Sequence, residues 1–381
     1  MHKARQVSHS EKILILFLIV GFLIVTCLFI VNNQMLSWDF RNNVWAPGYL
    51  LLNQRNPFDL SDLFDISGAV WLPPFIGATF YLGLLPERIA TNIWAVLNVV
   101  AYFSLLALLI TPQKPERLWL ILGLLGALLF PPFVSTVISG QIGILNMLIW
   151  FSSFYFLSKK QAGPAGFLTI LSISKPQLLI LVGPAMLMMA YRMGKWPLLI
   201  RFIAYGALFT ILLTIPLWIA YPQWINAYIE ALRLMPGYEQ PSSLHLLRVY
   251  LGNTIGILVW SVFCIGIELT LLRYWKRTKD YRKALIWTLA LTPIVAPYTW
   301  SWDYVLLMPA LIWTLLHLKS PISKTLLCVG YGFVWVATIR IRLLTDGNEI
   351  RFWWMSWMIL VILGVVWWID HRIHQKDHAK I

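Results

Sequence analysis

The chain contains little charge and almost no cysteine. Charged residues make up 12% of its 381 residues, whereas a soluble domain has about 25%. Hydrophobic residues make up 59%, and the mean hydropathy is +0.71. These values exclude a soluble enzyme. The three cysteines all lie in apolar runs, which indicates neither a disulfide framework nor a thiolate metal site.

Long uncharged runs dominate the sequence instead. Ile13–Leu36 and Leu118–Ser158 contain no charged side chain, and about 20 apolar residues suffice to cross a bilayer. We therefore predict an all-α, polytopic membrane bundle of about 12 transmembrane helices that forms a single domain over residues 1–381. The predicted spans are 13–31, 89–110, 118–134, 138–158, 163–174, 177–191, 198–220, 254–272, 283–296, 303–318, 324–341 and 352–370.

The apolar segment Trp71–Leu85 decides how the chain threads through the membrane. It is short and opens with Pro73-Pro74. If it stays at the outer surface, 21 of the 30 lysines and arginines fall on the cytoplasmic side. If it crosses, later basic loops such as 273–283 face outward. The positive-inside rule favours the first threading, so we interpret 71–85 as a juxtamembrane or re-entrant helix.

This threading gives the protein three long outer segments, at 32–88, 221–253 and 342–351, and a cytoplasmic tail at 371–381. Most acidic residues then lie outside. The net charge of +14 reflects basic cytoplasmic loops rather than nucleic-acid binding. We expect an integral plasma-membrane protein with both termini in the cytoplasm and its activity on the outer face.

Asp39 is the strongest candidate for a catalytic residue. It follows the first predicted helix by a few residues, which places it at the outer membrane surface between Trp38 and Phe40. Aromatic neighbours partly desolvate a carboxylate, which raises its pKa and suits it to act as a base. The alternative is that Asp39 caps the helix suggested by residues 40–52.

Two further polar residues interrupt the apolar spans. Gln141 follows Gly140 at an outer junction, where it can hydrogen-bond a sugar hydroxyl or serve only as a polar turn residue. Lys175 precedes Pro176 within the otherwise uncharged stretch 163–191. A lysine in such a stretch usually faces a cavity or a partner and suits a phosphate group. The alternative is that it snorkels to the interface.

An aromatic turn, which contains Trp300, Asp303 and Tyr304, joins two predicted spans. Aromatic rings can stack on the C–H faces of a sugar, and a carboxylate accepts protons from its hydroxyl groups. The turn is therefore a candidate sugar site. The alternative is an interfacial aromatic belt in which Asp303 caps a helix.

The remaining outer charges give weaker signals. Asp62 and Asp65 share one helical face, which is typical of a solvated surface. With no Asp-x-Asp motif and His245 as the single outer histidine, a divalent metal is not supported. Arg233 and Arg248 can contact lipid headgroups in general or the phosphate of one donor in particular.

In their order and membrane placement, these residues resemble the membrane glycosyltransferases of the GT-C class, specifically glycosyltransferase family 87. The resemblance covers most of the chain and is carried by Asp39-Phe40, Asn56-Pro57-Phe58-Asp59, Pro73-Pro74, Gly140-Gln141, Lys175-Pro176, Pro297-Tyr298 and Asp303-Tyr304. The chain departs from the pattern at one place. The family often has asparagine two positions after the Gly-Gln pair, where this chain has Gly143, and Asn146 comes three residues later.

The resemblance implies transfer of a sugar, commonly mannose, from a polyprenyl-phosphate donor on the non-cytoplasmic face. The acceptor would be a hydroxyl group of a glycan or glycolipid, Asp39 would be the catalytic base, and no cofactor is expected. The leaving phosphate departs as an anion and needs cations rather than an acid. The predicted substrate-binding residues are Lys175, Gln141, Trp300, Asp303, Tyr304, Asp59, Arg233 and Arg248.

Three rival functions remain. A transporter or flippase of lipid-linked sugars would favour charges within the spans and two related halves. A non-catalytic scaffold would leave the convergence of Asp39, Lys175 and Asp303 on one face unexplained. An O-antigen ligase or polymerase also handles prenyl-linked sugars, but such enzymes usually have a large late outer loop, and here the longest outer segment is the first.

Overall fold

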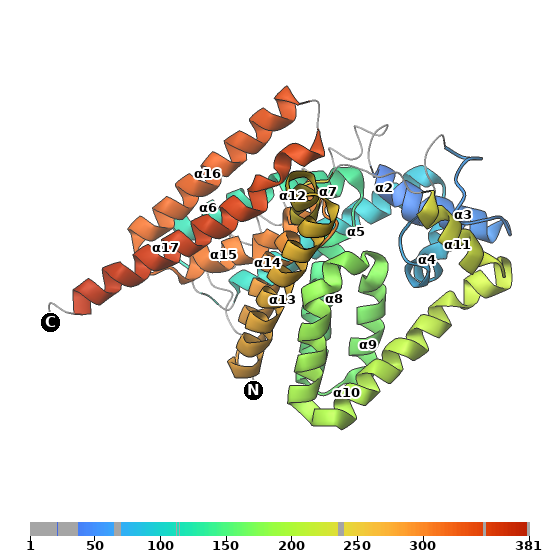
Figure 1. The fold of residues 1–381 in the computed structure, drawn as a ribbon, viewed down its shortest axis with the longest axis horizontal. Helices are drawn as coiled ribbons and strands as arrows, with labels where there is room; N and C mark the ends of the chain where they lie inside the picture. The colour runs from blue at the N-terminus through green and yellow to red at the C-terminus, as the bar shows by residue number, and fades with distance from the viewer. Residues whose placement is uncertain are drawn as a thin grey trace, which may run out of the picture.

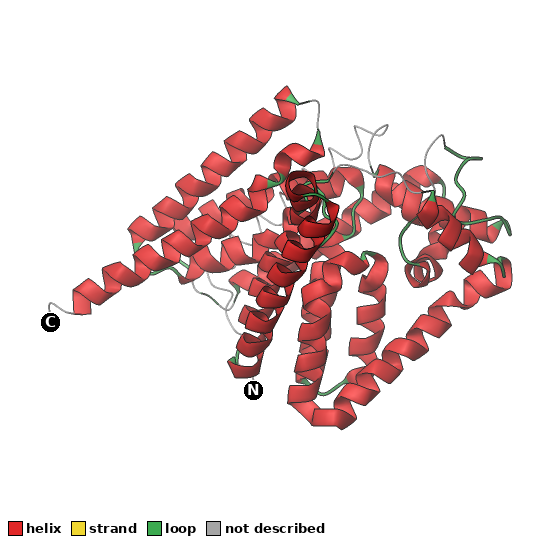
Figure 2. Cartoon of the chain, viewed as in Figure 1, coloured by secondary structure: helices red, strands yellow, loops and turns green. Residues whose placement is uncertain are grey.

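The computed structural model describes residues 21, 37–64, 70–111, 113, 115–234, 240–345 and 348–378. Every regular element among these residues is a helix, and no strand occurs in them (Figure 2). The all-α prediction is confirmed for this part of the chain. Apart from position 21, the predicted first span, 13–31, lies outside the described residues, as does Asp65.

The helices follow one another along the chain, and the longest connection among them is the one between residues 52 and 73. The N-terminal ones are α2 (Trp38–Phe40), the π-helix η1 (Arg41–Trp45), α3 (Ala46–Leu52), α4 (Pro73–Thr79), the 3₁₀ helix η2 (Phe80–Leu84) and α5 (Glu87–Ile110). The middle ones are α6 (Arg117–Leu128), α7 (Pro131–Ser139), α8 (Gly143–Ser158), α9 (Ala162–Leu171), η3 (Ser172–Ser174), η4 (Pro176–Leu178), α10 (Leu179–Ala220), α11 (Trp224–Arg233) and α12 (Ser243–Leu251). The C-terminal ones are α13 (Asn253–Arg277), α14 (Tyr281–Val295), η5 (Ser301–Leu307), α15 (Met308–His317), α16 (Pro321–Leu344), η6 (Glu349–Phe352) and α17 (Trp354–His378).

Several helices are long and apolar enough to cross a membrane. The described residues contain five, and six if the pair α6–α7, bent by 41°, is one span. In the most apolar stretches of α10, α13 and α16 only 17% of the residues are buried. Such large exposed apolar surfaces are unfavourable in water and favourable in lipid, so the chain is a membrane protein. The count of twelve spans stays a prediction, because the helices at 138–158, 163–174, 283–296 and 303–318 are shorter.

Helix α10 contains the break that separates the predicted spans 177–191 and 198–220. Gly194 and Lys195 leave the helical conformation, with Lys195 at φ 56°, and Pro197 follows. Figure 1 shows the two limbs of α10 diverging from this bend. Each limb is therefore a helix of its own direction.

The ambiguous segment 71–85 forms two short helices, α4 and η2. Seven residues of α-helix extend about 10 Å, whereas the hydrocarbon core of a bilayer is about 30 Å thick. Helix α4 packs closely on the second limb of α10, because a Cβ atom on Gly77 would collide with the carbonyl oxygen of Leu213. The segment is thus covered by protein and too short to cross alone.

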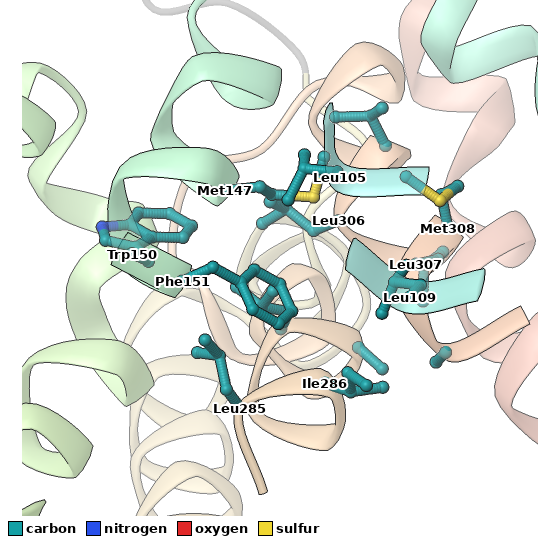
Figure 3. Close-up of a cluster of buried hydrophobic side chains, with 14 of the residues drawn as sticks. Leu105, Leu109, Met147, Trp150, Phe151, Leu285, Ile286, Leu306, Leu307 and Met308 are labelled. Atoms are coloured by element: carbon teal, nitrogen blue, oxygen red, sulfur yellow. The ribbon is translucent and has the colours of Figure 1, made fainter. Parts of the chain in front are cut away.

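The main core lies where α5, α8, α14, η5 and α15 meet. Figure 3 shows side chains from all five elements converging there, and they are Leu105, Leu109, Met147, Trp150, Phe151, Leu285, Ile286, Leu306, Leu307 and Met308. All are at most 7% exposed. This packing fixes the positions of α8, α14 and η5 relative to one another. Several of the polar residues described next lie in or beside these helices.

Candidate functional site

Segments that are far apart in the sequence enclose one cavity of about 530 Å³, which we call the Asp39 cavity. They are α2 with η1, the chain before α4, the junctions at 141 and 174–177, α11, and the turn before η5. The lining residues are Trp38, Asp39, Asn42, Asn43, Val70, Trp71, Leu72, Gln141, Ser174, Lys175, Pro176, Gln177, Tyr228, Leu232, Tyr298, Trp300 and Trp302. The cavity is therefore built largely at helix ends.

Gly140 allows the segment that carries Asp39 to lie against the α7–α8 junction. Its φ is +71°, and a Cβ atom there would lie 2.7 Å from the Cβ of Ser37 and 2.8 Å from that of Phe40. Only glycine fits such a position without displacing its neighbours. The close approach lets the Nε2 group of Gln141 donate a hydrogen bond to Oδ2 of Asp39. The Gly-Gln pair thus holds the carboxyl group in place.

The Asp39 carboxyl group is buried, with 8% of the residue exposed. Burial raises its pKa from 3.8 to about 7; the positive charge of Lys175 lowers this pKa, and the negative charge of Asp303 raises it. A carboxyl group with a pKa near 7 is present in both protonation states at neutral pH. It can therefore accept a proton during a reaction and release it afterwards.

Lys175 and Asp303 form a buried ion pair next to Asp39. The ammonium Nζ lies 2.9 Å from Oδ1 of Asp303, and the two side chains are 6% and 0% exposed. The other carboxylate oxygen of Asp303 accepts a hydrogen bond of 3.0 Å from the backbone N–H of Trp300. Lys175 is part of the cavity lining, whereas Asp303 is not. Among the described lining residues, Lys175 is the only cation and Asp39 the only carboxylate.

Four of the aromatic lining residues contact one another through their rings, and we call them the aromatic wall: Trp38, Tyr298, Trp300 and Trp302. The rings of Trp300 and Trp302 stack with centroids 5.0 Å apart at 15°, and Trp38 meets Trp302 edge-on at 6.5 Å. The Nε1 group of Trp300 donates a hydrogen bond of 2.8 Å to the Tyr298 hydroxyl. The wall offers flat apolar faces beside a carboxylate.

Three predicted substrate-binding residues lie away from this cavity. Asp59 is exposed, and its carboxylate accepts a hydrogen bond from the backbone N–H of Ser61. Arg233 is exposed and pairs with Glu230 at 3.6 Å. Arg248 is exposed on α12. None of them lines the Asp39 cavity, and their part in substrate binding stays a prediction.

Tyr304 and Asn146 are also absent from the cavity lining. Tyr304 is fully buried, and its hydroxyl donates a hydrogen bond of 2.7 Å to the carbonyl oxygen of Pro241. It therefore anchors η5 to the segment before α12. Asn146 is fully buried on α8 and is not part of the cavity lining, and a role for it beside Gln141 stays a prediction.

The structure adds cavity residues that the sequence did not single out. Asn43 links two segments of the cavity lining, because its Nδ2 donates a hydrogen bond to the carbonyl of Asp39 and its Oδ1 accepts one from the N–H of Val70.

Ser174 and Trp302 each have a buried polar atom, Oγ and Nε1 respectively, without a hydrogen-bond partner. These two atoms are therefore available to hydrogen-bond a polar ligand in the cavity. Trp302 lies in the aromatic turn, whereas no sequence signal identifies Trp71 or Ser174.

In the part of the chain that the structure describes, no group of three or more His, Cys, Asp or Glu residues is arranged to hold a metal ion. The chemistry that the cavity itself offers is that of one carboxyl group, one ion-paired lysine, an aromatic wall and unpaired hydrogen-bonding groups. This combination suits proton transfer from a sugar hydroxyl group.

Comparison with known protein families identifies a family for this chain. The family model described as glycosyltransferase family 87 matches residues 72–297, which is more than half of the 381 residues. No curated protein matches the chain. The matched stretch includes Gln141 and Lys175, whereas Asp39, Trp300 and Asp303 lie outside it.

Proposed function

The chain belongs to glycosyltransferase family 87, and we propose on that basis that it transfers a sugar, with mannose as the first candidate, from a polyprenyl-phosphate donor to an acceptor hydroxyl group. The proposal places the reaction in the Asp39 cavity. The observation that carries it is the buried Asp39 carboxyl group, with a pKa of about 7, facing a cavity with an aromatic wall. The acceptor is a glycan or glycolipid at the same membrane surface.

In the proposed reaction the acceptor oxygen forms a bond to the anomeric carbon of the donor sugar. The bond between that carbon and the phosphate oxygen breaks, and its electron pair leaves with the phosphate. The acceptor proton moves to the carboxylate of Asp39, which Gln141 holds in place by its hydrogen bond. No nucleotide is needed, because the donor already carries its leaving group.

Lys175 is the cation that we assign to the departing phosphate. It lines the cavity, and its charge is partly balanced by Asp303. The donor phosphodiester carries one negative charge and a second develops on the phosphate as the sugar leaves, and a lysine beside it stabilises this charge. The apolar residues Val70, Leu72 and Leu232 in the lining can cover the first part of the prenyl chain.

We further propose that the cavity opens to the non-cytoplasmic face of the plasma membrane. Gln141 precedes α8 and Lys159-Lys160 follow it, so the cavity and this basic loop lie at opposite ends of one helix. Basic loops favour the cytoplasmic side. The outer face is also where a flipped, lipid-linked donor presents its sugar.

The experiment that tests the function uses purified protein in bilayers with radiolabelled prenyl-phosphate sugars and a membrane-extract acceptor pool. Transfer from one prenyl-phosphate sugar, and none from a nucleotide sugar, is expected. In sealed right-side-out vesicles the donor should work when added outside. Absence of transfer from every prenyl-phosphate sugar, with folded protein, would contradict the proposal, and scrambling of the lipid would then indicate a flippase.

The rate of transfer should depend on pH through Asp39. Only the carboxylate form accepts a proton, so with a pKa of about 7 the rate should rise with pH and level off above about pH 8. At pH 6 about a tenth of the groups are ionised, which predicts roughly one tenth of the plateau rate. Initial rates at saturating donor between pH 5 and 9 check this. A profile that is flat below pH 7 would exclude Asp39 as the base.

A further inference from the structure

Beyond the cavity, a charged pair from α16 and η6 contacts the turn that carries Trp300 and Trp302 of the aromatic wall. Arg342 lies in the last turn of α16, and Glu349 begins η6, which leads into α17. Nη2 of Arg342 lies 3.0 Å from Oε1 of Glu349. The same nitrogen donates a second hydrogen bond, also of 3.0 Å, to the hydroxyl of Ser301. The pair is thus joined directly to the turn before η5.

Glu349 also accepts a hydrogen bond from the backbone of that turn. Its second carboxylate oxygen, Oε2, accepts a hydrogen bond of 3.1 Å from the N–H of Ser301. The Glu349 side chain is 10% exposed, and the guanidinium of Arg342 stacks 4.6 Å above the ring of Phe352, which is fully buried. Charged hydrogen bonds in a partly buried setting are stronger than neutral ones at the surface. This contact is therefore a fixed part of the fold.

In the sequence Ser301 stands between Trp300 and Trp302, the two residues of the aromatic wall whose rings stack on each other. Its neighbours are held by other partners, because Asp303 accepts from the N–H of Trp300 and Thr136 donates to the carbonyl of Trp302. Arg342 and Glu349 hold Ser301 itself through hydrogen bonds to its hydroxyl and its backbone N–H, and we call these two bonds the tether. Loss of this tether would free Ser301 and change the angle between the rings.

We propose that Arg342 and Glu349 are positioning residues that orient the aromatic wall for the sugar ring of the donor, and this rests on the proposed function. Neither residue touches the cavity. Both lie beyond residues 72–297, so the family match does not assign them a role. Their substitution should weaken donor binding while the chemical step, which depends on Asp39, continues.

The first test measures the tether itself and needs no activity. Hydrogen–deuterium exchange of peptides that cover 298–303 should be about 10-fold faster at the Ser301 amide in Glu349→Ala than in the wild type. Glu349→Gln keeps an oxygen acceptor and should exchange more slowly than Glu349→Ala. Arg340→Gln, an exposed position on the same helix, is the matched control and should leave exchange in this peptide unchanged. Unchanged exchange in Glu349→Ala would overturn the proposal.

The second test measures transfer with the prenyl-phosphate sugar. Arg342→Ala and Glu349→Ala should raise KM for the donor about 10-fold with kcat within about 2-fold, and Arg342→Lys should recover most of the loss. In the Trp300→Ala, Trp302→Ala background, adding Glu349→Ala should leave KM unchanged, because the wall it orients is gone. A further rise in KM there, or a fall in kcat alone, would overturn the role in donor binding. If the wild type transfers no sugar although the exchange result holds, the proposed function fails and the tether does not.

Discussion

Replacing Asp39 with asparagine is expected to reduce sugar transfer by about 10²–10⁴-fold, the contribution typical of a general base. Asparagine keeps the size of the side chain and an oxygen that can accept the hydrogen bond from Gln141. It cannot accept the proton of the acceptor hydroxyl. The measurement is kcat in bilayers at pH 8, where Asp39 is mostly ionised.

The same variant should fold at least as well as the wild type, which separates catalysis from stability. The folded pKa of Asp39 is raised above its unfolded value, so its stabilising contribution is present below about pH 4 and lost as the pH rises towards 7. The asparagine side chain has no charge to bury, so the thermal transition of the variant at pH 8 should lie no lower than that of the wild type. Asp62→Asn, an exposed carboxylate of the same outer segment, is the control for both measurements. Full activity of Asp39→Asn would refute its role as base.

The sequence predicted this carboxylate because its surroundings are local. Asp39 stands beside Trp38 and Phe40 in the chain and follows a predicted span, so a position at the membrane surface and its desolvation could both be expected. The structure also brings Gln141 to Asp39, although 102 residues separate them. A contact over that distance depends on packing that hydropathy does not encode, here the space left by Gly140.

Charges were harder to place than apolar residues. The long apolar runs correctly predicted helices, and the break in α10 falls between two predicted spans. The sequence placed Asp39, Lys175 and Asp303 on one face, but it also assigned Arg233 and Arg248 to the same site. Those two arginines are exposed on α11 and α12, whereas Lys175 points inward because the chain breaks at Pro176. The pairing of Lys175 with Asp303, 128 residues away, had no signal in the sequence.

Replacing Lys175 with methionine is the second change with a large expected effect. It would leave the Asp303 carboxylate fully buried without its cation, and breaking a buried pair in this way destabilises a protein by about 3–5 kcal/mol. The thermal transition of the purified protein in detergent should fall accordingly. Because the charge of Lys175 lowers the pKa of Asp39, any remaining activity should also need a higher pH.

The double variant Lys175→Met, Asp303→Asn decides what the lysine does. Neutral asparagine can still accept the hydrogen bond from the N–H of Trp300 and no longer needs a cation, so most of the lost stability should return. If Lys175 also stabilises the departing phosphate, transfer should stay at least about 100-fold below the wild type despite the recovered fold. Recovery of transfer together with stability would assign Lys175 to the ion pair alone, and the phosphate would then need another cation. Comparing the two variants thereby separates the role of Lys175 in pairing with Asp303 from its role in stabilising the departing phosphate.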